Sequence, residues 1–313
     1  MKKNIVVSDI LTFIIFFGMV SIAEIFDEKE IIFPEAAALC AGALLAPVQP
    51  WSVSKPRFVL IMTICSTAGL GLSLVTIPLI LKVMAGFLIA VVCINVFRCS
   101  LVPAISACVL PVLMNTRSII YPISVFVLAL CTVLFQLFLE KLNLRKQKEF
   151  EKTEPLNKKA VFHWLIMFAC ILVYSIYPTT SGNVLLIAPP LIVMFCEMMS
   201  DERKFFKKEH TLCIFVIICA VVGSMCNFAA AYFNISAILC GAVVSVIIIL
   251  LMNIFKIYFP PAAALAFLPF IVSEDILLWY PLFVAITAIV ISVTSAIVSR
   301  VSVNSKNNIL MKK

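Results

Sequence analysis

Four short segments that combine proline with small residues are the parts of this chain whose residue types could bind a solute. In the first half they are 33–38 (Phe-Pro-Glu-Ala-Ala-Ala) and 102–106 (Val-Pro-Ala-Ile-Ser). In the second half they are 188–191 (Ala-Pro-Pro-Leu) and 259–264 (Phe-Pro-Pro-Ala-Ala-Ala). Proline lacks an amide donor and has a preset φ, so it fits the first turn of a helix. Each segment therefore predicts a helix start.

A helix start within a membrane has chemistry that suits an anion. Its first amides have no partner inside the helix, and the helix dipole makes that end positive. The alternative interpretation is a tight corner between helices, since proline and small residues are common in membrane helices. The predicted solute-binding residues are Pro34, Glu35, Pro103, Ser106, Pro190, Pro261, Ala262 and Ala263.

Charged residues inside apolar segments are costly in a membrane unless they are paired or functional. Glu35 directly follows Pro34 in a short apolar segment, which marks it as a binding residue. Glu197 lies near the end of its segment and is predicted to reach the cytoplasmic interface. Lys82 stands alone near the outer end of a segment, where we expect its long side chain to extend to the headgroups.

Arg98 and Lys256 occupy matching positions at the inner ends of two segments, one turn after Asn95 and Asn253. The two cations are predicted to anchor those ends on the cytoplasmic side, with an electropositive vestibule for anions as the alternative. The two amides could hydrogen-bond a solute or link neighbouring helices, and the link is the preferred interpretation.

Membrane helices are the elements that must position these residues. Hydrophobic residues make up 63% of the chain and charged residues 13%, and the mean hydropathy is +1.15. A soluble globule needs a polar surface, so this composition predicts an integral membrane protein. The first apolar segment is longer than a usual signal core and has no small-x-small cleavage site, which predicts a retained helix.

Twelve apolar segments divide the chain into candidate helices. Lengths near twenty residues fit a spanning helix, whereas the second, fifth and eleventh segments are short for one. The segments are 10–26, 33–48, 58–76, 77–97, 101–114, 119–139, 160–177, 183–199, 211–230, 235–255, 260–273 and 279–299.

The distribution of basic residues predicts the orientation of these segments. With the N-terminus inside, all but three of the 24 lysines and arginines fall on the cytoplasmic side, the exceptions being Lys29, Lys82 and Arg117. The cytoplasmic set includes a basic patch at 203–208. This positive-inside pattern predicts a multi-pass cell-membrane protein with both termini in the cytoplasm. The net charge of +8 then indicates anionic lipid headgroups as partners, and no nucleic acid.

The same pattern of residues occurs twice in the chain. The stretch 95–98, Pro103 and Pro111 recurs 158 positions later as 253–256, Pro261 and Pro269. Tyr-Pro pairs follow at 121 and 280, 159 positions apart. Duplicated membrane units with broken helices in corresponding positions are typical of transporters.

The duplication predicts an all-α polytopic protein of two tandem repeats with about six membrane segments each. An even number of segments gives both repeats the same orientation, related by an axis along the membrane normal. The predicted parts are a first repeat over 1–140, a cytoplasmic basic linker over 141–160, a second repeat over 161–300 and a cytoplasmic tail over 301–313.

Catalytic and metal-binding patterns are missing from the sequence. It has no G-x-S-x-G, no phosphate-binding glycine loop and no H-E-x-x-H. The two histidines are far apart, and the twelve cysteines lie in apolar stretches without C-x-x-C pairs. The sequence therefore predicts no enzyme, no cofactor and no metal site.

The second half, from 185 to 299, resembles the HPP family of integral membrane proteins. That family is named for a His-Pro-Pro motif followed by small residues, which matches 259–265 with Phe259 in place of the histidine. The stretch 189–197 is similar to an earlier proline segment of the family. In the first half Pro50, Trp51 and 55–57 are similar to its Pro-Arg loop, and Pro103 stands where the double proline would be. Chloroplast members are associated with nitrite transport, so the resemblance implies a small anion.

These observations predict a transporter or permeation pathway for a small anionic solute, with its site at the interface of the two repeats. The alternative is a non-transporting scaffold or regulatory subunit that assembles with another membrane protein. A polar cavity between the halves would favour the first function, and a dry interface the second. The sequence leaves a homo-oligomer open.

Overall fold

The computed structural model describes residues 2–200 and 209–310, and within that part every regular element is a helix. Eight helices are long and apolar enough to cross a membrane. This confirms the all-α architecture expected of a polytopic membrane protein. The eight are α1 (Lys2–Ile25), α3 (Lys55–Leu74), α4 (Leu79–Val96), α6 (Ile120–Lys141), α7 (Lys158–Ser181), α10 (Glu209–Phe233), α11 (Ala237–Phe255) and α13 (Tyr280–Leu310).

The proline segments form helices that are too short to span. They are α2 (Pro34–Cys40), which continues as the π-helical turn η2 (Ala41–Leu45), α5 (Ala104–Leu113), α8 (Pro189–Ser200) after the 3-10 turn η3 (Val184–Ile187), and α12 (Pro260–Phe267), which continues as η4 (Leu268–Ile271). At about 1.5 Å per residue, even α8 is roughly 18 Å long against a hydrocarbon core of about 30 Å. By its length in the sequence, 183–199 was predicted to belong with the spanning segments. Pro189 and Pro190 shorten it, because they fix the helix start at that point.

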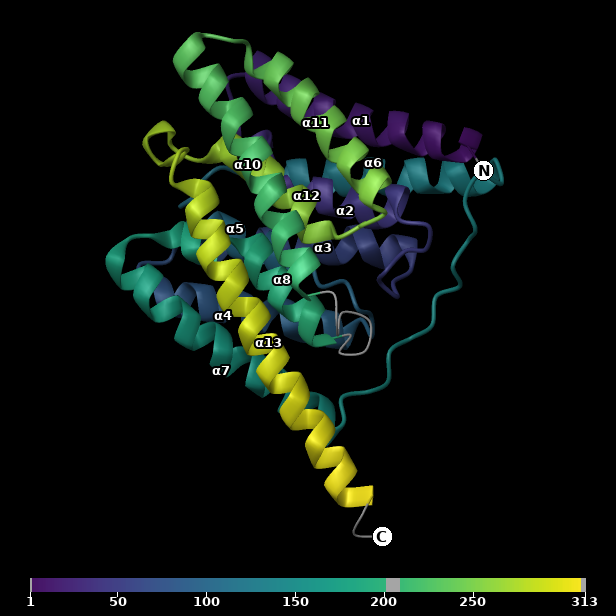
Figure 1. Cartoon of the computed structure of the whole chain (residues 1–313), viewed down its shortest axis with the longest axis vertical. Coiled ribbons are helices and arrows are strands. Elements are labelled where there is room, and N and C mark those ends of the chain that lie inside the picture. The colour runs from purple at the N-terminus through teal and green to yellow at the C-terminus, as the bar shows by residue number, and fades with distance from the viewer. Residues whose placement is uncertain (1, 201–208, 311–313) are drawn as a thin grey trace.

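Long helices of the two halves lie against each other (Figure 1). Within the first half α3 contacts α5 and α6, and within the second half α10 contacts α12 and α13. The first helix of each half crosses to the other half, because α1 contacts α11 and α7 contacts α4. Two further 3-10 turns, η1 (Lys29–Ile31) and η5 (Glu274–Ile276), lie in loops at the end of the molecule opposite the N-terminus.

Glycine allows the short helices to approach the long ones closely. A Cβ atom at Gly69 in α3 would lie 2.8 Å from the carbonyl carbon of Cys108 in α5, and closer still to its oxygen. A Cβ atom at Gly223 in α10 would lie 2.7 Å from the carbonyl carbon of Ala266 in α12. Real side-chain carbons do not approach a backbone this closely, so both positions require glycine.

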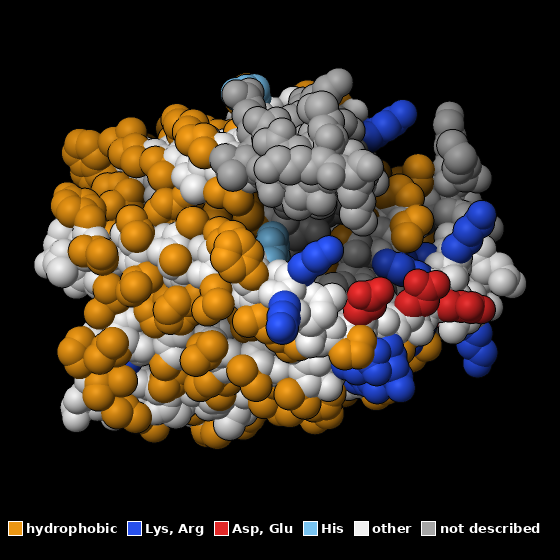
Figure 2. All heavy atoms as spheres, turned by 90° about the horizontal axis from the view of Figure 1, so that it is seen from below, with side chains coloured by type: hydrophobic (Ala, Val, Ile, Leu, Met, Phe, Trp, Pro, Cys, Tyr) orange, Lys and Arg blue, Asp and Glu red, His pale blue; other side chains and the backbone are white. Residues whose placement is uncertain are grey.

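The surface fits a lipid environment over much of its area. Large apolar side chains such as Leu88, Val92 and Val96 on α4 are exposed. Figure 2 shows hydrophobic side chains over most of one face, with lysine, arginine and acidic residues gathered at one end. That end carries residues 142–157, and we refer to it as the linker end; the opposite end is the far end.

The linker between the two halves is held against the first half. Helix α6 ends at Lys141 and α7 begins at Lys158. Between them, Arg145 donates hydrogen bonds of 3.0 Å to the Leu44 carbonyl, 2.7 Å to the Ala46 carbonyl and 3.3 Å to the Gly42 carbonyl. These carbonyls end the short helix of α2 and η2, so a guanidinium group caps it. Most of the predicted tail over 301–313 continues the last helix, since α13 extends to Leu310.

Arg145→Gln should destabilise the protein by about 3 kcal/mol, because it removes charge-assisted hydrogen bonds from partly buried carbonyls. Thermal unfolding in detergent would measure the change. Lys146→Gln is the matched control, since Lys146 is adjacent and exposed. Equal midpoints for the two variants would contradict the capping role.

Candidate functional site

The four short helices form a connected group inside the protein. Helix α2 contacts α12, α12 contacts α8, and α8 contacts α5. Their prolines face protein and not lipid. The buried prolines are Pro34, Pro103, Pro189, Pro190, Pro260 and Pro261.

Two predicted binding residues from different segments meet in this group. The hydroxyl of Ser106 in α5 donates a hydrogen bond to Oε1 of Glu35 in α2. Glu35 is 1% exposed and Ser106 is fully buried. The second carboxyl oxygen of Glu35, Oε2, has no hydrogen-bond partner in the described part of the chain, and no ion pair there involves Glu35. A half-satisfied carboxyl group at this depth is the most unusual polar feature of the site.

Two buried tyrosines lie within electrostatic range of the Glu35 carboxyl. Tyr121 in α6 donates a 2.9 Å hydrogen bond to the Ala107 carbonyl in α5. Tyr280 in α13 donates a 2.7 Å hydrogen bond to the Leu265 carbonyl in α12. Sequence reasoning used both residues only as markers of duplication. The available signal was that a tyrosine in an apolar segment needs a partner for its hydroxyl.

The helix starts offer fewer free amides than the sequence suggested. The Ala36 amide donates to the Phe33 carbonyl at 2.8 Å, and the Ala262 amide donates to the Phe259 carbonyl at 3.1 Å. The Leu191 amide does the same with the Ala188 carbonyl at 2.8 Å. Because the prolines before these residues have no N–H group, the first turn of each helix is left with its dipole but with few donors. Ala263 is buried beside Ala262. Among the described side chains of the four short helices, Glu35 Oε2 is the buried oxygen without a hydrogen-bond partner.

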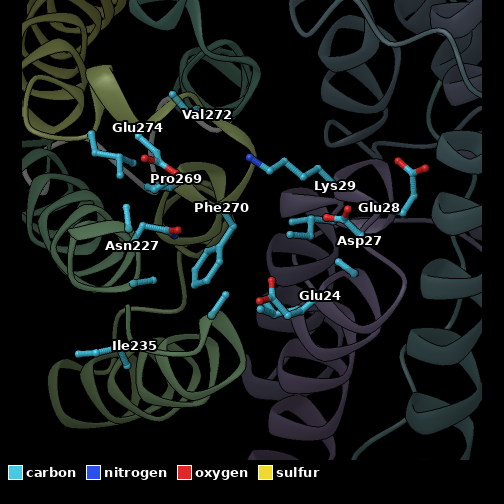
Figure 3. Close-up of a pocket in the computed structure, with 17 residues that line it drawn as sticks. Glu24, Asp27, Glu28, Lys29, Asn227, Ile235, Pro269, Phe270, Val272 and Glu274 are labelled. Atoms are coloured by element: carbon cyan, nitrogen blue, oxygen red, sulfur yellow. The ribbon is translucent and has the colours of Figure 1, made fainter. Parts of the chain in front are cut away.

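A polar cavity of about 230 Å³ opens at the far end between the two halves of the chain. Figure 3 shows α1 and the loop after it on one side, and α10, α11 and η4 on the other. The labelled Lys29 extends into the space between the two sides, and Phe270 points into it. The carboxylates that line this cavity are Glu24, Asp27, Glu28 and Glu274.

A smaller cavity of about 130 Å³ at the same end reaches the wall of the site. Its lining includes the exposed Lys29, the half-buried Glu30, and the buried Thr116 and Tyr121. Tyr121 also contacts the start of α2, since the centroid of its ring lies 6.0 Å from that of Phe33, the residue before α2. This cavity therefore lies between the far end and the surroundings of Glu35.

Glu197 does not reach the surface as predicted. It is 8% exposed, and its Oε1 accepts a 3.1 Å hydrogen bond from the indole N–H of Trp51. The indole can lie there because Gly42 has no side chain; a Cβ at Gly42 would be 2.5 Å from the Trp51 ring. The loop between α2 and α3 folds inward, and its Trp51 covers the carboxyl group. This contact could not be predicted from segment 183–199 alone, because Trp51 is distant in sequence.

The two asparagines differ in their partners. Asn253 donates a 2.9 Å hydrogen bond to Asp9 in α1, which confirms a link between helices. Asn95 instead donates at 2.7 Å to the Val91 carbonyl of its own helix, so the predicted link is wrong at that position. Sequence reasoning overlooked Asp9, although an acidic residue in the first apolar helix was a signal for a buried partner.

Three cations in or next to α4 and α11 lie at helix ends. Lys82 donates a 3.0 Å hydrogen bond to the Ser73 carbonyl at the end of α3, so it caps a helix and does not simply extend to headgroups. Arg98 and Lys256 have left-handed φ values of 50° and 54° just after α4 and α11. Such a residue ends a helix, and both occupy the matching positions identified in the sequence.

No group of three or more potential metal ligands occurs among the residues that the structure describes. The twelve cysteines there are all free thiols, and most are buried. The basic patch at 203–208 lies outside the described residues, and so do Lys312 and Lys313.

Comparison with known proteins leaves the site to be interpreted from its own geometry. No family model, no curated protein and no solved structure matches the chain. The resemblance to the HPP family stays a prediction.

Proposed function

We propose that this protein is a membrane transporter, or a permeation pathway, that carries a small anion together with a proton. The observation that supports it is the buried Glu35 carboxyl, which has one hydrogen bond from Ser106 and one oxygen without a partner. An ionisable residue inside a membrane domain is by default a candidate for function.

Protonation of Glu35 explains how such a group can be present. An ionised carboxylate buried with a single hydrogen bond is costly, and binding a proton removes the charge. The resulting O–H group is a donor that points from Oε2, the atom without a partner. An anion that accepts this hydrogen bond would cross with the proton, and the pair carries no net charge.

The charge at the two ends supports this assignment. Basic residues gather at the linker end (Figure 2). Arg57 lies over the Phe150 ring, Arg98 donates to the Thr153 carbonyl, and Lys148 is itself part of the linker. A net charge of +8 also draws anions toward the protein. At the far end the carboxylates around the larger cavity would attract protons and repel free anions. Following the positive-inside rule, we assign the linker end and both termini to the cytoplasm, and the protein to the cell membrane.

We further propose that the two halves are like-oriented repeats of one unit. Equivalent contacts support this: Gly69 and Gly223 each lie against the carbonyl of a short helix, and Tyr121 and Tyr280 each donate to one. A duplicated unit of this kind would be in line with membership of the HPP family. The site then lies where the short helices of both units meet.

A non-transporting scaffold is the alternative function. It would explain close helix contacts, but it offers no role for an unpaired buried carboxyl or for a polar cavity between the halves. Transport accounts for both features.

Ser106→Ala tests the proposal in proteoliposomes that contain an entrapped pH-sensitive dye. With a panel of small anions such as nitrite, formate and chloride, we expect wild-type protein to speed internal acidification by at least one of them. The variant should slow it about tenfold, because it removes the hydrogen bond that positions the Glu35 carboxyl group.

Ser66→Ala is the matched control, since Ser66 is equally buried but donates only to the Thr63 carbonyl of its own helix. It should keep the wild-type rate. Wild-type liposomes that acidify no faster than protein-free liposomes with every anion would contradict the transport function.

A further inference from the structure

A deep apolar groove runs along the outside of the protein between α4 and α7. Its volume is about 520 Å³. Leu88, Val92 and Val96 line it from α4, and Val161, Trp164 and Leu165 line it from α7. All but Trp164 are exposed, and both helices are long and apolar enough to span a membrane, so the groove opens toward lipid.

The equivalent slot in the other half of the molecule is closed. There α1 lies against α11, with Gly241 directly against Val20. Asp9 and Asn253 join the same two helices by a hydrogen bond. Between α4 and α7, Asn95 turns back to its own helix and lines the groove instead. The open slot is therefore a particular property of the α4–α7 pair.

One end of the groove is basic. Arg98 lines it there, at the linker end of α4, and its Nε donates a 3.0 Å hydrogen bond to the Thr153 carbonyl. Within the described residues, no hydrogen bond or ion pair uses its two terminal nitrogens. Lys158 is exposed and lies one turn before Val161, on the groove side of α7. Glu154 is the acidic residue nearest in sequence to Lys158, and it does not line the groove.

We propose that this groove binds one phospholipid with an anionic headgroup, its acyl chain lying along the groove and its phosphate against Arg98. On α4, eight residues separate Leu88 from Val96, a rise of about 12 Å, and Arg98 lies two residues beyond the helix end. A leaflet of the hydrocarbon core is about 15 Å deep, so the groove spans most of one leaflet. The apolar lining matches an acyl chain. The unpaired guanidinium nitrogens suit a phosphate, and the charge of Arg98 and Lys158 favours an anionic lipid over a zwitterionic one. This site is independent of the transport function.

Fluorescence quenching of Trp164 tests the lipid site directly. The full chain carrying Trp279→Phe removes the exposed tryptophan, while Trp51 stays as a constant background because it is buried. In nanodiscs, brominated phosphatidylglycerol and brominated phosphatidylcholine are compared at equal mole fractions. We expect the anionic lipid to associate about fivefold more strongly, because one basic residue near the membrane surface, here mainly Arg98, favours an anionic lipid by about 1 kcal/mol.

Arg98→Asn in this background should bring the ratio of the two lipids close to one. Asparagine tolerates the left-handed backbone of this position, so the variant is expected to fold. Lys256→Asn is the matched control, with the same backbone conformation at the end of α11, and it should keep the preference. Lys158→Gln, at an exposed position, gives a second measurement and should lower the ratio partway.

Three results would overturn the proposal. One is equal quenching by the two lipids with Arg98 present, and another is a preference that Arg98→Asn leaves unchanged. The third is a Trp164 that neither lipid quenches, which would indicate that a second copy of the chain fills the groove.

Discussion

Glu35→Gln should reduce proton-linked anion uptake to below about a tenth of the wild-type rate, the scale expected when a required proton-transfer group is lost. Glutamine has the same shape, and its carbonyl oxygen can still accept the hydrogen bond from Ser106. It cannot gain or release a proton. The thermal midpoint should therefore change little while transport is lost. Dye-loaded proteoliposomes and unfolding in detergent measure the two quantities on one preparation.

Glu197→Gln is the control for this experiment, because Glu197 is, among the described residues, the second buried glutamate on a short helix, and it accepts a hydrogen bond from Trp51. Its variant should retain uptake. Loss of uptake to the same extent in both variants would show that any buried carboxyl is needed for assembly, and retention in Glu35→Gln would remove the proton-binding role.

Gly69→Ala should destabilise the protein by about 3 kcal/mol, because the added methyl group would collide with the Cys108 carbonyl of α5. A backbone carbonyl cannot move aside without shifting the short helix. For a protein of this size we expect the thermal midpoint to fall by about 5–10 °C. Gly223→Ala should behave alike, since its methyl group would meet the Ala266 carbonyl of α12.

Gly71→Ala is a control on the same helix as Gly69. It lies two residues away, and a Cβ there meets no atom within 4 Å. Alanine is the better helix former by about 1 kcal/mol, so this variant should be as stable as wild type or slightly more stable. If Gly69→Ala and Gly71→Ala unfold at the same temperature, the close approach of α3 and α5 is wrong.

The number, order and approximate limits of the helices could be predicted from the sequence, because hydrophobic length and proline position are local properties. The proline segments were located correctly. Glu35 was selected as a charged residue in a short apolar segment, and Ser106 as part of the proline segment 102–106. That the two side chains share a hydrogen bond could not be predicted, since no pattern along the chain says which helices lie side by side.

The errors at Glu197 and at the helix starts have a common physical origin. Glu197 is covered by Trp51 from a loop distant in sequence, which gives a buried acid a donor. The amides of Ala36 and Ala262 bond to carbonyls just before their helices, a tight first turn that proline content alone does not reveal. In both cases hydrogen-bond partners decided the outcome, and partners depend on the three-dimensional fold.

The contact between α1 and α11 has a consequence for biogenesis. Helix α1 gains its main partner only when Ala237–Phe255 has been made. At roughly 5–20 residues per second, that wait lasts tens of seconds. During it, the face of α1 that will meet Gly241 must be shielded by lipid or by the insertion machinery. A chain whose synthesis stops before α11 would keep this face exposed to the quality-control machinery of the membrane.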